Sequence, residues 1–158
     1  PISAMLCADN RWAHCNIKST SLLGNVLLMN QARSHGCKEV VMHRDNYLTE
    51  AGASSVFYLN EEGIVRTSSL SENILPGITR EILINALVDT PFQVQEGKCN
   101  IEDFNSSPCM WLSSSTKGLL PLNALVGSKY SYKEANGGFE EINKIFNAAV
   151  QSHLSAAI

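Results

Sequence analysis

The sequence lacks long apolar runs and lacks an excess of charge of either sign. Its 158 residues include 12 Lys and Arg and 15 Asp and Glu, which leaves a net charge of −3. The basic residues are scattered, so they form no electrostatic footprint for nucleic acid. The longest nearly unbroken apolar stretches, such as residues 22–29, are far shorter than the roughly 20 residues that a membrane-spanning helix needs. We therefore expect neither a nucleic acid nor a membrane as a partner.

Cysteine and histidine spacings typical of disulfide frameworks or metal sites are also missing. The five cysteines include no CxxC pair, and an odd number fits neither a secreted disulfide framework nor a zinc site. The four histidines lack the spacing of metal ligands. We therefore expect a reduced, cytoplasmic protein without a metal.

Several catalytic motifs and all signs of a domain boundary are absent. The sequence contains no GxSxG, GxxxxGK[ST] or HExxH motif, so hydrolase, nucleoside triphosphatase and metalloprotease activities have no support. It has no internal repeat, low-complexity tract or long Pro/Gly/Ser linker. With 44% hydrophobic and 17% charged residues, it has the composition of one ordinary globular domain.

The chain does contain a mixture of strand and helix patterns without strict alternation, which predicts an α+β fold. Apolar residues at helical spacing predict helices over residues 21–35, 78–88 and 139–150, with a short helical turn at residues 101–104. Apolar and β-branched runs predict strands over residues 2–6, 11–18, 38–43, 47–49, 54–59, 64–67, 92–95, 110–113 and 119–126.

Lys18 ends the predicted strand of residues 11–18, beside Ser19, Thr20 and Ser21. A lysine at a strand end is most often an exposed surface residue. The alternative is an amine nucleophile held in a pocket, where burial would activate it to form a Schiff base with a carbonyl compound. The residue pattern alone favours the surface interpretation.

Glu50 precedes a run of small residues, 51–55, that leads into the apolar residues 56–58. The simpler interpretation is a solvated acid in a loop. However, small side chains beside a carboxylate would let a flat ligand approach the backbone closely, while the carboxylate pairs with a protonated ring nitrogen.

The turn at Pro76-Gly77 leads directly into a predicted helix. The amides of Ile78 and Thr79 would be unpaired donors at the positive end of the helix dipole, and together with the Thr79 hydroxyl they would bind phosphate. The simpler interpretation is a helix start capped by Thr79. The hydroxyl-bearing residues 113–116 either form a turn or add donors to the same phosphate.

In their order along the chain these segments resemble the class IV (fold type IV) pyridoxal-phosphate aminotransferases, and most closely the bacterial D-amino-acid transaminases. The resemblance covers nearly the whole chain. The segments that carry it are RWAHCNIKS (residues 11–19), LLGNVL (22–27), HRDN (43–46), TE (49–50), ILPGITR (74–80) and SST (114–116).

The resemblance implies that Lys18 forms the Schiff base with pyridoxal phosphate and moves a proton at the substrate's α-carbon. It implies that Glu50 pairs with the pyridine nitrogen, which keeps the ring able to accept electrons. The other cofactor-contact residues that it implies are Arg11, Ser54, Ser55, Leu75, Gly77, Ile78, Thr79, Ser114 and Ser115.

Some residues depart from the family pattern. Ala51 follows Glu50 where family members usually have glycine, and Ser55 stands where many have asparagine. Leu23 occupies a position where branched-chain enzymes commonly carry a tyrosine near the cofactor, which favours the D-amino-acid group.

The resemblance also predicts the architecture and the assembly. Residues 1–158 correspond to the large C-terminal domain, a mixed β pseudo-barrel with flanking helices. The small N-terminal domain of the family, which supplies an arginine to the phosphate and binds the substrate carboxylate, has no counterpart in this sequence. We expect a homodimer of the full-length enzyme with sites near the interface.

The expected activity is the transfer of an amino group between a D-amino acid, such as D-alanine, and a 2-oxo acid, such as 2-oxoglutarate. A branched-chain aminotransferase and an aminodeoxychorismate lyase remain alternatives, because these enzymes use the same lysine, glutamate and phosphate cup. An alternative of another class is a cofactor-binding fragment without turnover.

Overall fold

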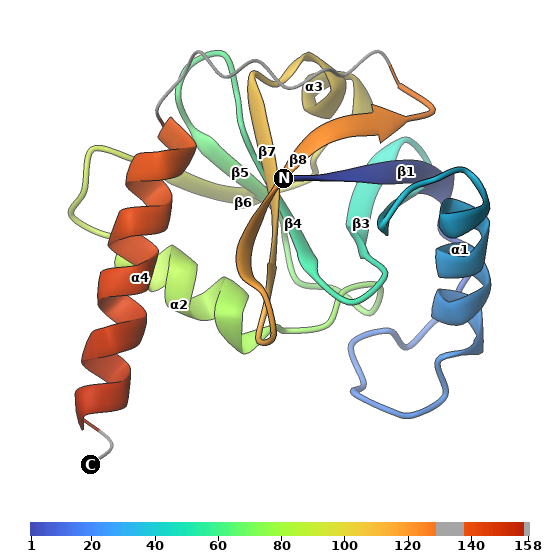
Figure 1. Cartoon of the computed structure of the whole chain (residues 1–158), viewed down its shortest axis with the longest axis horizontal. Coiled ribbons are helices and arrows are strands. Elements are labelled where there is room, and N and C mark those ends of the chain that lie inside the picture. The colour runs from blue at the N-terminus through green and yellow to red at the C-terminus, as the bar shows by residue number, and fades with distance from the viewer. Residues whose placement is uncertain (129–137, 157–158) are drawn as a thin grey trace.

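Eight strands form one curved, mixed sheet with helices at its sides (Figure 1). The computed structural model describes residues 1–128 and 138–156. In space the strands follow the order β3-β2-β1-β8-β7-β4-β5-β6. Their bounds are β1 Ile2–Ala8, β2 Glu39–Arg44, β3 Tyr47–Ala51, β4 Ser55–Leu59, β5 Val65–Ser68, β6 Val94–Gly97, β7 Cys109–Ser114 and β8 Gly118–Val126.

The helices have the bounds α1 Leu23–Ser34, α2 Ile78–Ala86, α3 Ile101–Ser106 and α4 Gly138–Ala156. Helices α1, α2 and α4 cover the outer face of the curved sheet, whereas α3 packs Phe104 into its interior. Helix α1 packs on β1 and β2, whereas α2 and α4 pack together beside β7 (Figure 1). No helix in the described residues is long and apolar enough to cross a membrane.

The sheet curls until its two edges approach each other, which produces the expected pseudo-barrel. Edge strand β3 contacts β4 and β5, although neither is its neighbour in the sheet order. The Leu48 amide of β3 donates a hydrogen bond at 2.8 Å to the carbonyl of Cys99, which follows the other edge strand, β6. The Ser68 hydroxyl donates to the Leu48 carbonyl at 2.8 Å. These bonds satisfy backbone groups that an open edge would leave unpaired.

Alternation along β4 and β7 directs side chains to two different cores. Val56 and Tyr58 face the barrel interior, whereas Phe57 faces α2 and α4. On β7, Leu112 points inward and Trp111 outward. A third core lies between α1 and the strands β1 and β2. Because both faces of β4 and β7 are covered, their sequences are almost continuously apolar.

The α+β fold is confirmed, and each predicted helix and all but one of the predicted strands have a counterpart. The predicted strand over residues 11–18 is wrong, because this segment is an irregular loop. Its backbone groups bond to a neighbouring loop and to a side chain: the Asn16 amide donates to the Glu72 carbonyl, and Arg44 Nη2 donates to the Arg11 carbonyl.

Candidate functional site

A pocket opens at one end of the barrel, where β3 ends, β4 begins, β7 ends and α2 begins. Its cavity volume is about 230 Å³. All the residues expected from the sequence to contact a cofactor line it together: Arg11, Lys18, Glu50, Ser54, Ser55, Leu75, Gly77, Ile78, Thr79, Ser114 and Ser115. Residues that are widely separated in sequence therefore form one cavity, as the mouths of barrels commonly do.

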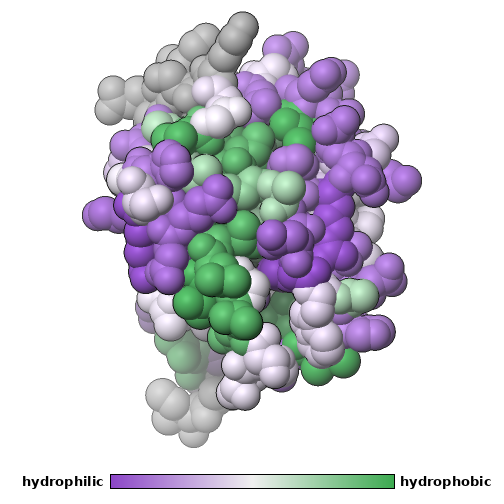
Figure 2. Space-filling view, turned by 90° about the vertical axis from the view of Figure 1, so that its right-hand side faces the viewer, coloured by the Kyte–Doolittle hydropathy of each residue, from purple (hydrophilic) through white to green (hydrophobic). Residues whose placement is uncertain are grey.

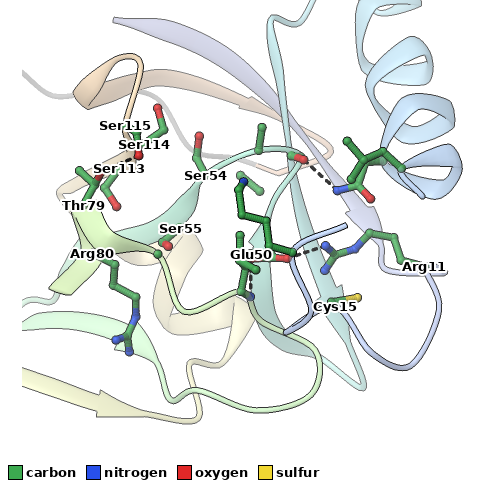
Figure 3. Close-up of a pocket in the computed structure, with 18 of the residues that line it drawn as sticks. Arg11, Cys15, Glu50, Ser54, Ser55, Thr79, Arg80, Ser113, Ser114 and Ser115 are labelled. Atoms are coloured by element: carbon green, nitrogen blue, oxygen red, sulfur yellow. Dashed lines mark hydrogen bonds and ion pairs between the residues drawn. The ribbon is translucent and has the colours of Figure 1, made fainter. Parts of the chain in front are cut away.

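Hydroxyl groups gather at one end of this pocket, under the first turn of α2 (Figure 3). Ser55 and Ser113 are directly paired across β4 and β7. By the alternation of those strands both point to the face that carries α2. Thr79 Oγ1 lies 3.5 Å from Ser115 Oγ. The cluster is thus built by two strand ends and one helix start.

Two observations show that these donors are not committed to holding the fold. Helix α2 is capped by Gly77 without any side-chain hydrogen bond, so the interpretation of Thr79 as a cap is wrong. Ser113 Oγ is buried and has no hydrogen-bond partner among the residues that the structure describes. A buried polar atom without a partner is costly. The end of the pocket is therefore suited to an anionic group with several acceptor oxygens.

The opposite end of the pocket carries Glu50, which lies far from the hydroxyl cluster in Figure 3. Its Oε1 accepts a hydrogen bond from Arg11 Nη1 at 2.5 Å, and its Oε2 accepts one from the Leu75 amide at 3.0 Å. A carboxylate offers about four lone-pair sites, so Glu50 retains capacity for a further donor. Burial raises the pKa of Glu50, and the bonds and charge of Arg11 offset this rise only in part.

Arg11 lies between two carboxylates. Asp9 binds it through three bonds, from Arg11 Nε at 2.9 Å, Nη2 at 2.9 Å and the backbone amide at 3.1 Å. Burial alone would raise the pKa of Asp9, but the bonds and charge of Arg11 and the Thr49 hydroxyl outweigh it, so the pKa is lowered. The two acids raise the pKa of Arg11 against its burial, so the guanidinium stays charged.

A wall of small residues, 51–53, directly after Glu50 in the sequence, lines the pocket. The Gly52 carbonyl accepts a bond from Asn25 Nδ2 of α1 at 2.8 Å. A Cβ added at Gly52 would lie 2.6 Å from Met29 Sδ and 2.7 Å from Glu39 Oε1. Only glycine fits there without displacing its neighbours, and the close packing keeps the wall flat.

Lys18 lines the pocket but is exposed, so the burial expected for a lysine in a pocket is not found in this chain. It follows Ile17 in the irregular loop rather than ending a strand. Leu23, which the resemblance relates to a residue near the cofactor, is exposed and does not line the pocket; Leu22 does.

Sequence reasoning missed several residues around the pocket. The sequence pattern predicts a role for Ser113 only as one of the hydroxyl-bearing residues 113–116, and it predicts no role for Asn25 or Asp9. The alternation of the apolar strand before residue 113 could have separated Ser113 from Ser114. An acid two positions before an arginine, at the end of an apolar strand, was the signal for Asp9.

Sequence comparison relates the chain to one enzyme family. A family model described as amino-transferase class IV matches residues 2–125. A D-alanine aminotransferase of Staphylococcus epidermidis is 30% identical over 152 residues, which cover 96% of this chain and 54% of that protein. A D-alanine aminotransferase of Listeria innocua is 33% identical over 125 residues, or 79% of this chain and 43% of that protein. The chain spans about half the length of the curated relatives it matches.

Solved structures share the fold. A hypothetical aminotransferase from Mycobacterium tuberculosis in a PLP-bound form has a TM-score of 0.84 at 20% identity, covering 96% of this chain and 56% of that one. A branched-chain amino acid aminotransferase of Escherichia coli gives 0.81 at 22% identity, covering 93% and 50%. A putative 4-amino-4-deoxychorismate lyase of Legionella pneumophila gives 0.82 at 20% identity, covering 94% and 56%. At these identities the likeness concerns the fold alone.

Proposed function

The chain belongs to the class IV aminotransferase family, and from this membership we propose that it forms the cofactor-bearing part of a pyridoxal-phosphate transaminase. The proposed reaction exchanges the amino group of a D-amino acid of the D-alanine type with a 2-oxo acid such as 2-oxoglutarate. The observation that carries the proposal is the pocket that brings Lys18 and Glu50 together with the hydroxyl cluster at the start of α2.

The residues of the pocket fit pyridoxal phosphate in their chemistry. The phosphate would be held by the Ser113, Thr79 and Ser115 hydroxyls and by the start of α2, where the N-cap residue Gly77 makes no side-chain hydrogen bond. Glu50, at the other end, has a free acceptor site for a protonated ring nitrogen. Leu75 lines the cavity between them and would pack on the ring. Gly77, Ser54 and Ser55 complete the lining.

When bound, the cofactor supplies a ring that accepts electrons and so makes the proton on the substrate's α-carbon removable. The amine of Lys18 would hold the cofactor covalently until substrate arrives, and would then remove and return the proton at the α-carbon. Glu50 would keep a proton on the ring nitrogen. The small side chains of residues 51–53 would let a flat ring lie against the backbone.

The preference for D-amino acids rests on the relatives. The two curated relatives described above are named D-alanine aminotransferases. The structural neighbours include a branched-chain enzyme and a putative lyase, so these remain the competing activities. The observation behind them is the shared fold.

We also propose that this chain is the C-terminal domain of a two-domain protein that acts as a homodimer in the cytoplasm. Lys18 lines the pocket and is exposed to solvent, which supports a site that other parts of the protein complete.

Large exposed apolar side chains lie next to the pocket, on and before α1: Trp12, Ile17, Leu22, Leu23, Val26 and Leu27. On the face that carries α1, Figure 2 shows apolar side chains gathered between hydrophilic ones. Five free, buried cysteines suit a reducing compartment.

In the proposed homodimer, a second copy of the protein packs against this apolar surface. Replacing Leu23 and Leu27 by serine in the full-length protein should shift the mass measured by light scattering from dimer to monomer. Replacing Leu154, an exposed apolar residue of α4, should leave the mass unchanged. A Leu23/Leu27 variant that stays dimeric contradicts this assignment.

The activity is tested by adding amino acids to the full-length protein loaded with pyridoxal phosphate. D-Alanine should convert the near-visible absorbance to that of the amine form, and 2-oxoglutarate should restore it. Conversion by L-leucine instead of D-alanine would favour the branched-chain alternative, and release of pyruvate from 4-amino-4-deoxychorismate would favour the lyase. Cofactor binding without conversion by any of them would identify a cofactor-binding protein without turnover.

A further inference from the structure

Asp9 lies just after β1, outside the lining of the pocket, yet it holds most of the Arg11 guanidinium. Its two oxygens take Arg11 Nε and Nη2, while Glu50 receives only Nη1. The Asp9 side chain is fully buried, and the Arg11 side chain is 3% exposed. Paired, charge-assisted bonds of this kind fix both the direction and the orientation of the guanidinium.

This sharing changes the charge that Glu50 presents to the pocket. If Arg11 were bound to Glu50 alone, the pair would be neutral and would weakly attract a cation. With Asp9 included, two carboxylates share the charge of Arg11, so Glu50 faces a guanidinium that is already paired. A nearby like charge makes a carboxylate a stronger proton acceptor, and Asp9 does contribute to the raised pKa of Glu50.

A second cation, Arg44, also pairs with Asp9, but it opposes this effect only in part. Arg44 Nε lies 3.4 Å from Asp9 Oδ2, and its side chain is 27% exposed, so its charge is better screened by solvent. Burial raises the pKa of the Cys15 thiol, which therefore stays neutral. Thr49 Oγ1 donates to Asp9 at 2.9 Å and brings no charge.

We propose that Asp9 is a positioning residue that neutralises and orients Arg11, so that Glu50 remains a strong proton acceptor for a ring nitrogen in the pocket. The inference rests on the proposed function for the identity of that ring. The arrangement itself is a property of this chain's own residues. It assigns a role to a buried acid that contacts neither the cavity nor a substrate.

The test is a titration of Glu50 in the cofactor-free protein, followed by ¹³C NMR of labelled glutamate side chains and assigned with Glu50→Gln. In the wild type the Glu50 pKa should lie above that of an ordinary glutamate. In Asp9→Asn it should fall, because the like charge is lost and Arg11 becomes free to pair with Glu50. Asp9→Glu, which keeps the charge, should stay closer to the wild type.

A matched control breaks another arginine–carboxylate pair. Glu96 of β6 pairs with Arg80 of α2, and Glu96→Gln should leave the Glu50 titration unchanged. An unchanged Glu50 pKa in Asp9→Asn overturns the proposal. If that variant does not fold, the wild type decides, because a Glu50 pKa below the ordinary value would show that Arg11 is not neutralised.

Loading the same variants with pyridoxal phosphate separates this inference from the proposed function. Asp9→Asn should slow the conversion by D-alanine about tenfold, less than the roughly 100-fold that a positioned acid or base contributes, while the cofactor still attaches to Lys18. A protein that binds no cofactor but shows the expected Glu50 shifts would overturn the proposed function and leave the Asp9–Arg11–Glu50 arrangement standing.

Discussion

The two ends of the pocket differ in chemistry at the level of single residues. Glu50 faces the cavity with Arg11 and the Leu75 amide already bound to it. The hydroxyls of Ser113, Thr79 and Ser115 lie at the other end. A ligand with a cationic nitrogen at one end and a phosphate at the other matches both.

Replacing Glu50 by glutamine tests the acidic end. Glutamine keeps the shape and an acceptor oxygen but cannot stabilise a proton on the ring nitrogen by charge. The loaded full-length protein should retain cofactor, and its rate of amino transfer from D-alanine should fall about 100-fold or more, a typical size for a positioned acid or base. Near-normal rates in stopped-flow measurements would contradict the role of Glu50.

A double variant, Ser113→Ala with Thr79→Val, tests the hydroxyl end. Hydrogen bonds to charged groups contribute about 1.5–3 kcal/mol each, so the Kd for pyridoxal phosphate should rise at least about tenfold. Pyridoxal, which lacks the phosphate, is the matched control ligand and should bind with unchanged affinity. Equilibrium dialysis measures both; equal losses for the two ligands would show that the hydroxyls do not contact a phosphate.

At this scale the residues singled out in the sequence line one pocket, whereas their surroundings were not predicted. Every residue expected to contact a cofactor lines that pocket. These residues were expected there because of the resemblance to the family. Asp9 was not predicted, since its importance depends on the direction of the Arg11 side chain. The exposure of Lys18 could not be predicted either, because it depends on which parts of the protein cover the pocket.

At the scale of elements, the loop of residues 9–22 shows where pattern reasoning fails. Apolar residues at positions 12, 15 and 17 suggested alternation, yet Trp12 and Ile17 are exposed while Cys15 is buried. The turn between β2 and β3 is local: Asp45 and Asn46 both adopt positive φ, as a tight turn there requires. Local turn chemistry determines such a turn, whereas the loop depends on contacts with Arg44 and Glu72 that are distant in sequence.

The wall between β3 and β4 provides a test at the scale of an element. Gly52→Ala should lower the free energy of unfolding by about 1–3 kcal/mol, as overpacking does, because its Cβ would meet Met29 Sδ and Glu39 Oε1. The exposed neighbour Ala53 is the control, and Ala53→Ser should change stability little. Urea unfolding measures both, and equal stabilities would contradict the close packing.

For the whole molecule, the sequence predicted the fold class and the approximate elements but not the order of the strands. The pairing of β1 with β8, distant in sequence, and the closure of β3 onto residues after β6 come from long-range packing. Hydrophobic alternation determines which face of a strand is buried, but it does not specify the neighbouring strand.

Stability of the whole molecule against pH should carry the signature of buried Glu39. Burial raises the pKa of Glu39, and the Val40 amide and Lys117 oppose this only in part. The pKa of Glu39 is higher in the folded chain than in the unfolded chain, so the unfolded chain loses this proton first as pH rises. Ionisation therefore favours unfolding, and the free energy of unfolding of the wild type falls as the pH rises through the folded-state pKa. The free energy of unfolding of Glu39→Gln minus that of the wild type should therefore be more positive at pH 7.5 than at pH 4.

The control for this comparison is Glu61→Gln, at an exposed position in the turn before β5. Its difference from the wild type should vary little between the same two pH values. A Glu39→Gln difference that becomes more negative with rising pH would mean that the folded state favours the charged form of Glu39.

The central claim is that the cofactor attaches to Lys18 in this pocket, and borohydride reduction tests it most directly. Full-length protein incubated with pyridoxal phosphate and reduced should gain one cofactor mass on the peptide that contains Lys18. Lys18→Ala should abolish the adduct and the near-visible absorbance, whereas Lys144→Ala, at an exposed position of α4, should change neither. An adduct at another lysine, or none in the wild type, would contradict the account.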